Sequence, residues 1–326
     1  MSKRKRQDFE KSPPITCLKD LITIGNTIEM YSNINMLMLW QILPYIEELD
    51  SLIGMENLKH SIFQQILYYI QDFHTNNVSE EYLHTVLMGP PGTGKTTVAH
   101  IISNIYKHLG ILSRDGTVKI AHKDDFVAGY VGQTAIKTQK LLKSCIGGVL
   151  FIDEAYSFGQ KNSKEESDSF SKEAIDILTS FLSEHSNDFC CIIAGYEQDI
   201  KNCFFGINKG LESRFQWKHI IDDYSATNLK DILLKKISIN NWHICCSDSD
   251  IVSILESNKD LFKNYGRDIV SLFNKCKISH AVRVINLPDQ HKYVLTRQDI
   301  LEGIKLIKKV KDKKNDSESL YKSLYI

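Results

Sequence analysis

Several features that would assign a sequence to a broad class of proteins are missing here. The 40 lysines and arginines balance the 40 aspartates and glutamates, so a general electrostatic grip on nucleic acid is not indicated. No apolar run approaches the roughly 18 to 20 residues that span a bilayer, which argues against a membrane protein. The cationic start is followed by no apolar segment, so we expect a protein that is not secreted.

The eight cysteines lack the spacing of a metal site or a disulfide framework. No C-x-x-C occurs, and two of the pairs are adjacent in the chain. We therefore expect reduced thiols in the cytoplasm or a cytosol-like compartment. The run KRKR at residues 3–6 has two interpretations, a nuclear address or a solvated tail, and both stay open.

The pattern of apolar residues divides the chain into four expected parts. Residues 1–44 are an N-terminal extension, disordered at first and then helical, with a kink at Pro44. Residues 45–224 alternate short strands with helices. Residues 225–308 contain successive helices and no repeat, and residues 309–326 form a charged tail.

Five short apolar segments of the second part are the strand candidates. Helices separate most of them, which favours an α/β fold with a parallel sheet between layers of helices. The helical part that follows begins with Ser225 or Thr227 as a cap. The five segments read LHTVLMG, TVKIAH, GVLFID, CCIIAG and WKHIIDD.

A phosphate-binding loop follows the first of these strands and opens a helix. The string GPPGTGKT fits G-x-x-x-x-G-K-[ST] in full, in the strand–loop–helix context that the motif requires. Its glycines allow tight turns that aim backbone N–H groups at phosphate oxygens, and the helix N-terminus favours anions. We expect nucleotide binding by Gly89, Pro90, Pro91, Gly92, Thr93, Gly94, Lys95, Thr96 and Thr97.

Two acidic residues stand at the end of another apolar strand. In GGVLFIDEAY, Asp153 and Glu154 come where open α/β sheets bind their ligands. We expect Asp153 and Thr96 to hold Mg²⁺ and Glu154 to act as a general base on the attacking water. Beside a phosphate loop, this pair favours ATP hydrolysis over nucleotide storage.

The combination resembles the AAA+ ATPases, P-loop NTPases with a small C-terminal helical lid. LIGMENLKHSI resembles their adenine-pocket segment, with Ile53 and Gly54 at the contact positions. GLESRF resembles the segment that carries their arginine finger, which makes Arg214 the candidate. YGRDIVSLF resembles the second sensor, with Arg267 toward the γ-phosphate.

Four further segments resemble one AAA+ group, the CbbX/SpoVK (CfxQ-like) ATPases, which include red-type rubisco activase and members in giant DNA viruses. The resemblance covers roughly residues 45–305. The segments are DDFVAGYVGQTAIKT, LFIDEAYSF, IIAGYEQDI and FFGINKGLESRF.

One position departs from the wider superfamily. The first sensor is commonly a small polar residue at the end of the fourth strand, but this strand ends in Gly195 and Tyr196. The Tyr196 hydroxyl can orient water, or the ring can simply pack, and both interpretations stay open.

Arg214 and Arg267 could instead be ordinary surface charges. The resemblance to the family argues against this alternative more strongly for Arg214 than for Arg267. A finger that acts across a subunit boundary implies a ring, because each site then needs a neighbour. We therefore expect a homo-oligomer, a hexameric ring by resemblance.

The segment after the second strand places an aromatic residue between glycines. Tyr130, Val131 and Gly132 match the aromatic–apolar–Gly pattern of the pore loop in threading AAA+ rings. An aromatic face can grip a peptide of any sequence. The alternative is a packed loop residue.

Three functions are compatible with these motifs. The first is an ATP-driven ring that remodels a protein substrate by pulling a segment through its pore. The second is a motor or loader on nucleic acid, which would need cations in the pore loop, where GYVGQTAIK supplies Lys137. The third is a nucleotide-switched assembly scaffold. Neutral charge and the aromatic loop favour the first.

Overall fold

The structure is a computed structural model that describes residues 11–73, 82–113, 118–130, 132–159 and 165–323. Side chains are described throughout these ranges except at 165–168 and 312–323. Val131 and the KRKR run lie outside the described residues.

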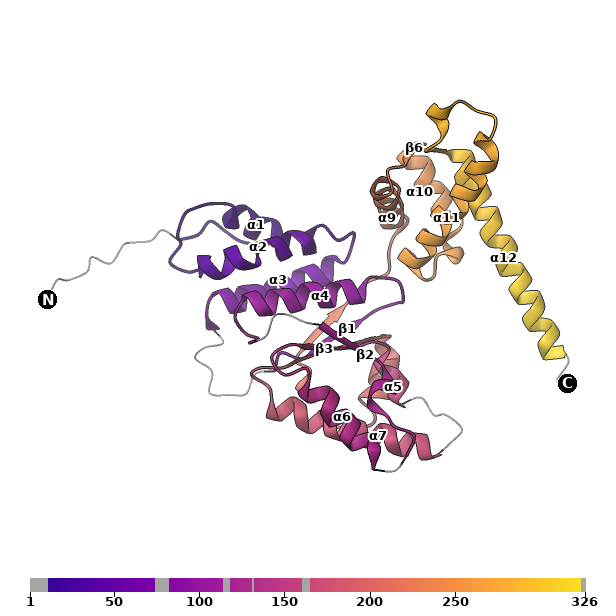
Figure 1. Cartoon of the computed structure of the whole chain (residues 1–326). Helices are drawn as coiled ribbons and strands as arrows, with labels where there is room; N and C mark the ends of the chain where they lie inside the picture. The colour runs from indigo at the N-terminus through magenta and orange to yellow at the C-terminus, as the bar shows by residue number, and fades with distance from the viewer. Residues whose placement is uncertain (1–10, 74–81, 114–117, 131, 160–164, 324–326) are drawn as a thin grey trace. The chain divides into compact units, whose positions relative to one another are not determined.

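A five-stranded parallel sheet in the order β2-β3-β4-β1-β5 forms the centre of the larger part of the chain (Figure 1). Every residue of β1, β3 and β4 is buried, because these strands lie inside the sheet with both faces covered. The five predicted strands are therefore confirmed, as β1 (Thr85–Met88), β2 (Val118–Ala121), β3 (Val149–Ile152), β4 (Cys190–Gly195) and β5 (Trp217–Ile220).

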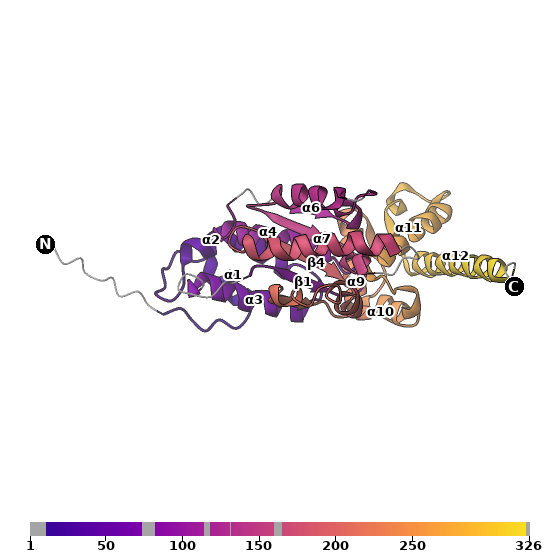
Figure 2. The same ribbon diagram turned by 90° about the horizontal axis from the view of Figure 1, so that it is seen from below.

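Helices cover both faces of this sheet. Figures 1 and 2 show α3 (Glu56–Ile70) and α4 (Lys95–His108) over one face, with α6 (Gln133–Lys143) and α7 (Glu165–Glu184) over the other. The second face encloses a continuous apolar core that joins strands, α6 and α7. Two N-terminal helices, α1 (Leu18–Gly25) and α2 (Met36–Asp50), add an outer layer, because α2 packs on α4 and α3.

Short elements follow three of the strands. α5 (Lys123–Phe126) comes after β2 and the 3₁₀ helix η2 (Ala155–Gly159) comes shortly after β3. After β4 the chain forms α8 (Glu197–Asp199), a π-helical turn η3 (Ile200–Phe204) and the 3₁₀ turn η4 (Glu212–Arg214).

The chain forms two compact units. The sheet unit contains residues 1–90 and 94–222, and the helical unit contains residues 91–93 and 223–326. The helical unit contains α9 (Ala226–Ile239), α10 (Asp248–Glu256), η5 (Lys259–Leu261), α11 (Tyr265–Val284), η6 (Asp289–His291), α12 (Arg297–Ser323) and the short parallel strands β6 (His243–Cys245) and β7 (Val294–Thr296).

Several details of the ends and of the helical unit differ from the expected pattern. The pair β6 and β7 was not expected, since strands of three residues leave little periodicity in a sequence. α2 continues through the expected boundary at 44/45, and α12 continues past 308 to Ser323. The second difference has a local cause, because the five lysines of residues 309–323 are good helix formers. The four-part division itself stays a prediction. Of the two cap candidates for α9, Ser225 is the cap, and its hydroxyl accepts from Asn228 N.

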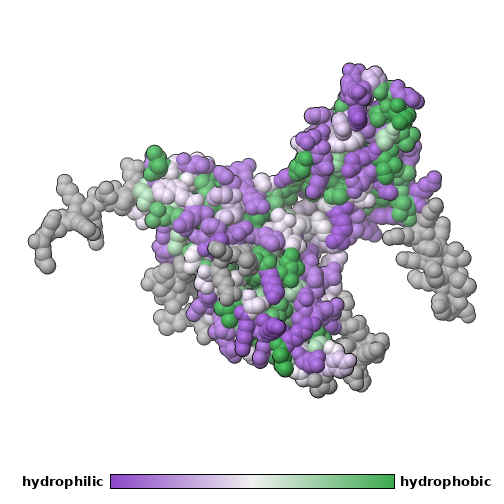
Figure 3. All heavy atoms as spheres, in the orientation of Figure 1, coloured by the Kyte–Doolittle hydropathy of each residue, from purple (hydrophilic) through white to green (hydrophobic). Residues whose placement is uncertain are grey.

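The surface is mostly polar on the face that Figure 3 shows, with green apolar patches on both units. Exposed apolar side chains of the helical unit include Ile278, Val282 and Ile285. Among the described residues, no helix combines the length and the apolar character that a bilayer crossing requires.

A buried ionic network ties the last helix of the helical unit to α11. The Asp299 carboxylate, 1% exposed, accepts from Arg283 Nε at 3.0 Å and Nη2 at 2.9 Å, and from Thr296 N at 2.8 Å. His280 Nδ1 lies 3.3 Å away. Burial alone would raise the pKa of Asp299, but the bonds from Arg283, Thr296 and His280 hold that pKa below its usual value.

We predict that Asp299→Asn lowers the free energy of unfolding by about 3 kcal/mol at neutral pH, because Arg283 loses its buried partner. The pKa of folded Asp299 lies below the unfolded value of about 3.9, so its stabilisation is present above that pH. It is lost as the pH falls through the folded pKa. Urea unfolding followed by circular dichroism from pH 7 to 3 measures both effects. Glu302→Gln, a half-buried position on α12 that does not contact Arg283, is the control. Equal stability and acid dependence in Asp299→Asn and wild type would contradict the assignment.

Candidate active site

The phosphate loop connects β1 to α4. Gly92 and Gly94 have φ values of +74° and +93°, which glycine adopts at low cost, and Gly94 is the N-cap of α4. Lys95 folds back over the loop, where its Nζ donates to Gly89 O at 2.9 Å and Pro90 O at 2.8 Å. The loop thus has the left-handed turns, helix N-terminus and side-chain cation that a nucleotide phosphate chain requires. Thr96 and Thr97 lie in the first turn of α4.

The middle of the loop, Pro91–Thr93, belongs to the helical unit. Within this unit Gly266 N donates to Gly92 O at 3.1 Å, and Tyr224 Oη donates to Thr93 O at 2.9 Å. A Cβ on Gly92 would lie 2.1 Å from Asn264 O, so no side chain fits there. Arg267 is exposed in the first turn of α11.

Asp153 and Glu154 follow β3 at the carboxyl edge of the sheet. Asp153 is half-buried, and its Oδ1 accepts from Glu154 N at 3.0 Å. Glu154 is exposed and has a left-handed backbone with φ of +51°, which is uncommon for a residue other than glycine. Strained conformations of this kind often occur at active sites.

The end of β4 lies between the phosphate loop and the acidic pair, because β4 separates β1 from β3 in the sheet. Gly195 pairs in register with Met88, and its carbonyl accepts from Gly89 N at 3.0 Å. The sheet therefore brings the start of the loop, the acidic pair and the sensor position to one edge. Tyr196, 40% exposed, caps α8 there.

Tyr156 adds a phenol to this edge that the sequence reasoning did not single out. Its ring centroid lies 5.9 Å from that of Tyr196, and its hydroxyl interacts with the Glu154 side chain. Burial raises the pKa of Tyr156 to about 12, with further contributions from Glu154 and Tyr196. The phenol therefore keeps its proton at neutral pH. An aromatic residue two positions after the acidic pair was the signal available in the sequence.

The expected adenine-contact residues precede α3. Ile53 and Gly54 are half-buried, and Met55 follows them as a buried N-cap of α3 with φ of +61°. A methyl group placed on Gly94 would lie 3.4 Å from Met55 Cε. The Ile53–Met55 segment therefore lies beside the phosphate loop, and Met55 is a contact that the sequence reasoning missed.

Arg214 is half-buried in η4 and bonded within its own chain. Its Nε donates to Ser183 Oγ at 2.6 Å, and its Nη1 donates to Gly210 O. Burial, together with the nearby charge of Arg214, lowers the pKa of the core histidine His84 to about 4. The guanidinium is thus held in one orientation on the surface of the sheet unit.

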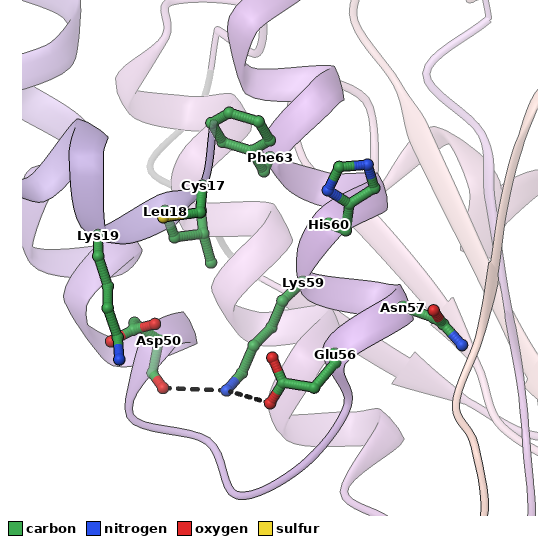
Figure 4. A pocket seen from close by; sticks show the side chains of 9 residues that line it. All are labelled: Cys17, Leu18, Lys19, Asp50, Glu56, Asn57, Lys59, His60 and Phe63. Atoms are coloured by element: carbon green, nitrogen blue, oxygen red, sulfur yellow. Dashed lines mark hydrogen bonds and ion pairs between the residues drawn. The ribbon is translucent and has the colours of Figure 1, made fainter. Parts of the chain in front are cut away.

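A separate cavity of about 470 Å³ lies between the start of α1, the end of α2 and α3 (Figure 4). Lys59 Nζ, in its wall, donates to Asp50 O at 3.1 Å and pairs with Glu56 at 3.5 Å. None of its lining residues comes from the phosphate loop or the acidic pair, so we do not assign the nucleotide to it. They are Cys17, Leu18, Lys19, Asp50, Glu56, Asn57, Lys59, His60 and Phe63.

The sheet order, the loop and the acidic pair together define a P-loop NTPase of the AAA+ type. Residues 85–217 match the family model described as ATPase family associated with various cellular activities (AAA). The crystal structure of the FIGL-1 AAA domain in complex with ADP matches the fold with a TM-score of 0.56 at 16% identity, over 86% of this chain and 92% of that chain.

Two relatives narrow the family. The chain is 38% identical over 239 residues to the putative cfxQ-like protein R730 of Acanthamoeba polyphaga mimivirus, covering 73% of this chain and 57% of that protein. It is 36% identical over 260 residues to stage V sporulation protein K of Bacillus subtilis (strain 168), covering 77% of this chain and 79% of that protein. The chain therefore belongs to the AAA+ ATPases, in their CbbX/SpoVK (CfxQ-like) group.

We predict that Lys95→Ala weakens ATP binding by at least about tenfold, because the phosphates lose a charge-assisted hydrogen bond. Titration calorimetry with ATP measures the loss. Lys107→Ala, in the last turn of the same helix, should bind like the wild type. Wild-type affinity in Lys95→Ala would show that the nucleotide binds elsewhere.

Proposed function

We propose that this ATPase forms a ring and uses ATP hydrolysis to pull a segment of a protein substrate through its centre. The chemistry begins at the sheet edge, where amides of the loop and Lys95 would hold the phosphates. Glu154 would take a proton from the attacking water, since it is exposed and follows β3 at the same edge of the sheet as the loop that follows β1.

The proposed metal ligands fit Mg²⁺ better than a metal that needs a protein cage. Among the described residues, no three His, Cys, Asp or Glu side chains gather as a metal site. Mg²⁺ commonly uses one or two protein ligands and completes its shell with phosphate and water oxygens. The Thr96 hydroxyl and the Asp153 carboxylate would supply the protein oxygens, and the ion would neutralise charge on the phosphates.

The observation that carries the remodelling proposal is the presentation of Tyr130. Its side chain is 74% exposed at the tip of the segment between α5 and α6, between exposed glycines 129 and 132. The base of this segment is fixed, since Ala128 N donates to Thr134 Oγ1 at 3.1 Å and Thr138 Oγ1 donates to Phe126 O at 3.1 Å. A fixed base with an exposed aromatic tip is suited to gripping a polypeptide.

Lys137, in the α6 helix that follows this segment, favours a protein substrate over nucleic acid. Lys137 Nζ donates to Asp124 O at 2.5 Å and to Val127 O at 2.9 Å. Its charge therefore holds the base of the loop together. A motor on nucleic acid would need cations that face the strand.

Direct contacts connect η2, the short helix that follows the acidic pair, to the base of this loop. Phe158 of η2 packs edge-on against Phe126 of α5 with ring centroids 5.2 Å apart, and both rings are buried. Lys123 Nζ, also in α5, donates to Ser157 O at 3.2 Å. Movement of η2 during the ATP cycle would therefore displace the loop that carries Tyr130.

The ring completes the site under this proposal. Arg214 would reach the γ-phosphate bound by a neighbouring subunit, in a ring that we take to be a hexamer by resemblance to the family. Arg267 would contact the γ-phosphate bound by its own subunit. Supporting this role, η4 places Arg214 on the surface of the sheet unit, half-buried and hydrogen-bonded. Tyr196 would help to orient water.

Tyr130→Ala should abolish unfolding of a fluorescent protein with an unstructured tail while ATP binding and ring assembly persist. Tyr130→Phe and Tyr130→Trp should keep much of the activity, because the grip requires an aromatic face. The measurement is fluorescence lost per ATP hydrolysed. An unchanged ratio in the alanine variant would remove Tyr130 from the proposal and leave a scaffold or a nucleic-acid motor as the better function.

Arg214→Ala should bind ATP like the wild type and hydrolyse it at least about a thousandfold more slowly, since a finger can contribute 10³ to 10⁵ in rate. Mixing Arg214→Ala with Lys95→Ala subunits should recover part of the activity. One subunit then supplies an intact pocket and the other an intact finger. Co-assembly without recovery would exclude a site shared between subunits.

A further inference from the structure

Two tyrosines occupy the place where the wider superfamily has a small polar sensor. Gly195 ends β4, and a Cβ there would lie 2.9 Å from Tyr156 Cδ1 and 3.1 Å from Ile200 Cγ1. The missing side chain at Gly195 is therefore what lets the Tyr156 ring approach the end of β4. A glycine replaces the usual small polar residue at the end of β4, and the Tyr156 ring of η2, which follows β3, lies in the space that a side chain there would need.

The Tyr156 ring lies between this strand end and Glu154. The ring contacts the Gly195 position on one side and faces the Tyr196 ring at 5.9 Å. Its hydroxyl interacts with the Glu154 side chain, which adds to the effect of burial in raising the pKa of the phenol. Glu154 is exposed and has a left-handed backbone, so without such an interaction its side chain can adopt several rotamers.

We propose that Tyr156 is a positioning residue, whose hydroxyl donates to the Glu154 carboxylate and holds it in the orientation that accepts the proton of the attacking water. Gly195 makes this possible by leaving room for the ring. The inference rests on the proposed role of Glu154 as general base. It assigns the sensor-like function at this edge to a phenol from η2, the same short helix that contacts the base of the Tyr130 loop.

The first test is Tyr156→Phe, which keeps the ring over Gly195 and removes the hydroxyl. The rate constant kcat for ATP hydrolysis should fall about tenfold or more, the value of one hydrogen bond to a charged group. KM and the dissociation constant for ATP should stay within about twofold, because the phenol does not hold the nucleotide. Tyr45→Phe removes another part-buried phenol, 3.4 Å from His108 in the N-terminal layer, and should leave both constants unchanged.

The second test uses the contact with Gly195. Gly195→Ala places a methyl group against the ring and should lower kcat by displacing it. In a chain that already carries Tyr156→Phe, Gly195→Ala should lower kcat by a much smaller factor than it does alone, because the hydroxyl that Gly195→Ala displaces is absent. Full multiplication of the two effects would show that Gly195 and Tyr156 act independently and would overturn the inference.

Glu154→Gln separates failure of the inference from failure of the proposed function. If Glu154→Gln hydrolyses ATP at the wild-type rate, the general-base role itself is wrong. If Glu154→Gln is inactive while Tyr156→Phe has wild-type kcat, the proposed function stands and the positioning role of Tyr156 is wrong. A thermal melt of Tyr156→Phe at the wild-type midpoint confirms that a change in kcat is local.

Discussion

The active site depends on the order of strands in one parallel sheet. β4 lies between β1 and β3, and all five strands run in the same direction. The phosphate loop, the acidic pair and the expected sensor position follow these three strands. Segments that are far apart in the sequence therefore lie at the same carboxyl edge of the sheet. The bond from Gly89 N to Gly195 O fixes the loop to the middle strand. These three strands are buried on both faces, as in other parallel sheets.

Strands and loops contribute differently to this edge of the sheet. The strands fix where the phosphate loop and the acidic pair begin, and the backbone is left-handed at Gly94 before α4, at Glu154 after β3 and at Met55 before α3. Such turns allow several backbone and side-chain groups to converge on a small volume. The short helix η2 then connects the acidic pair with α5 through the Phe126–Phe158 contact, which relates the proposed hydrolysis site to the exposed Tyr130.

The sequence predicted the features whose chemistry is local. The five strands and the loop could be recognised because burial and phosphate binding restrict consecutive residues. The contacts of Met55, Tyr156 and Lys137 could not, because each depends on a segment that the fold brings near. Gly195 shows the limit clearly: the sequence indicated that β4 ends without the small polar residue expected there by resemblance, and the structure shows the Tyr156 ring 2.9 Å from where a Cβ on Gly195 would lie. The strands β6 and β7 were missed because three residues carry too little pattern.

The central claim is that the carboxyl edge formed by β1, β4 and β3 is where ATP is bound and cleaved. The most direct measurement is a crystal structure of the Glu154→Gln chain with ATP and Mg²⁺. The account predicts that Lys95 Nζ leaves Gly89 O and Pro90 O for the phosphates, with the metal near Thr96 and Asp153 and the γ-phosphate facing residue 154. Phosphates bound away from this edge, with Lys95 still on the two carbonyl oxygens, would contradict it.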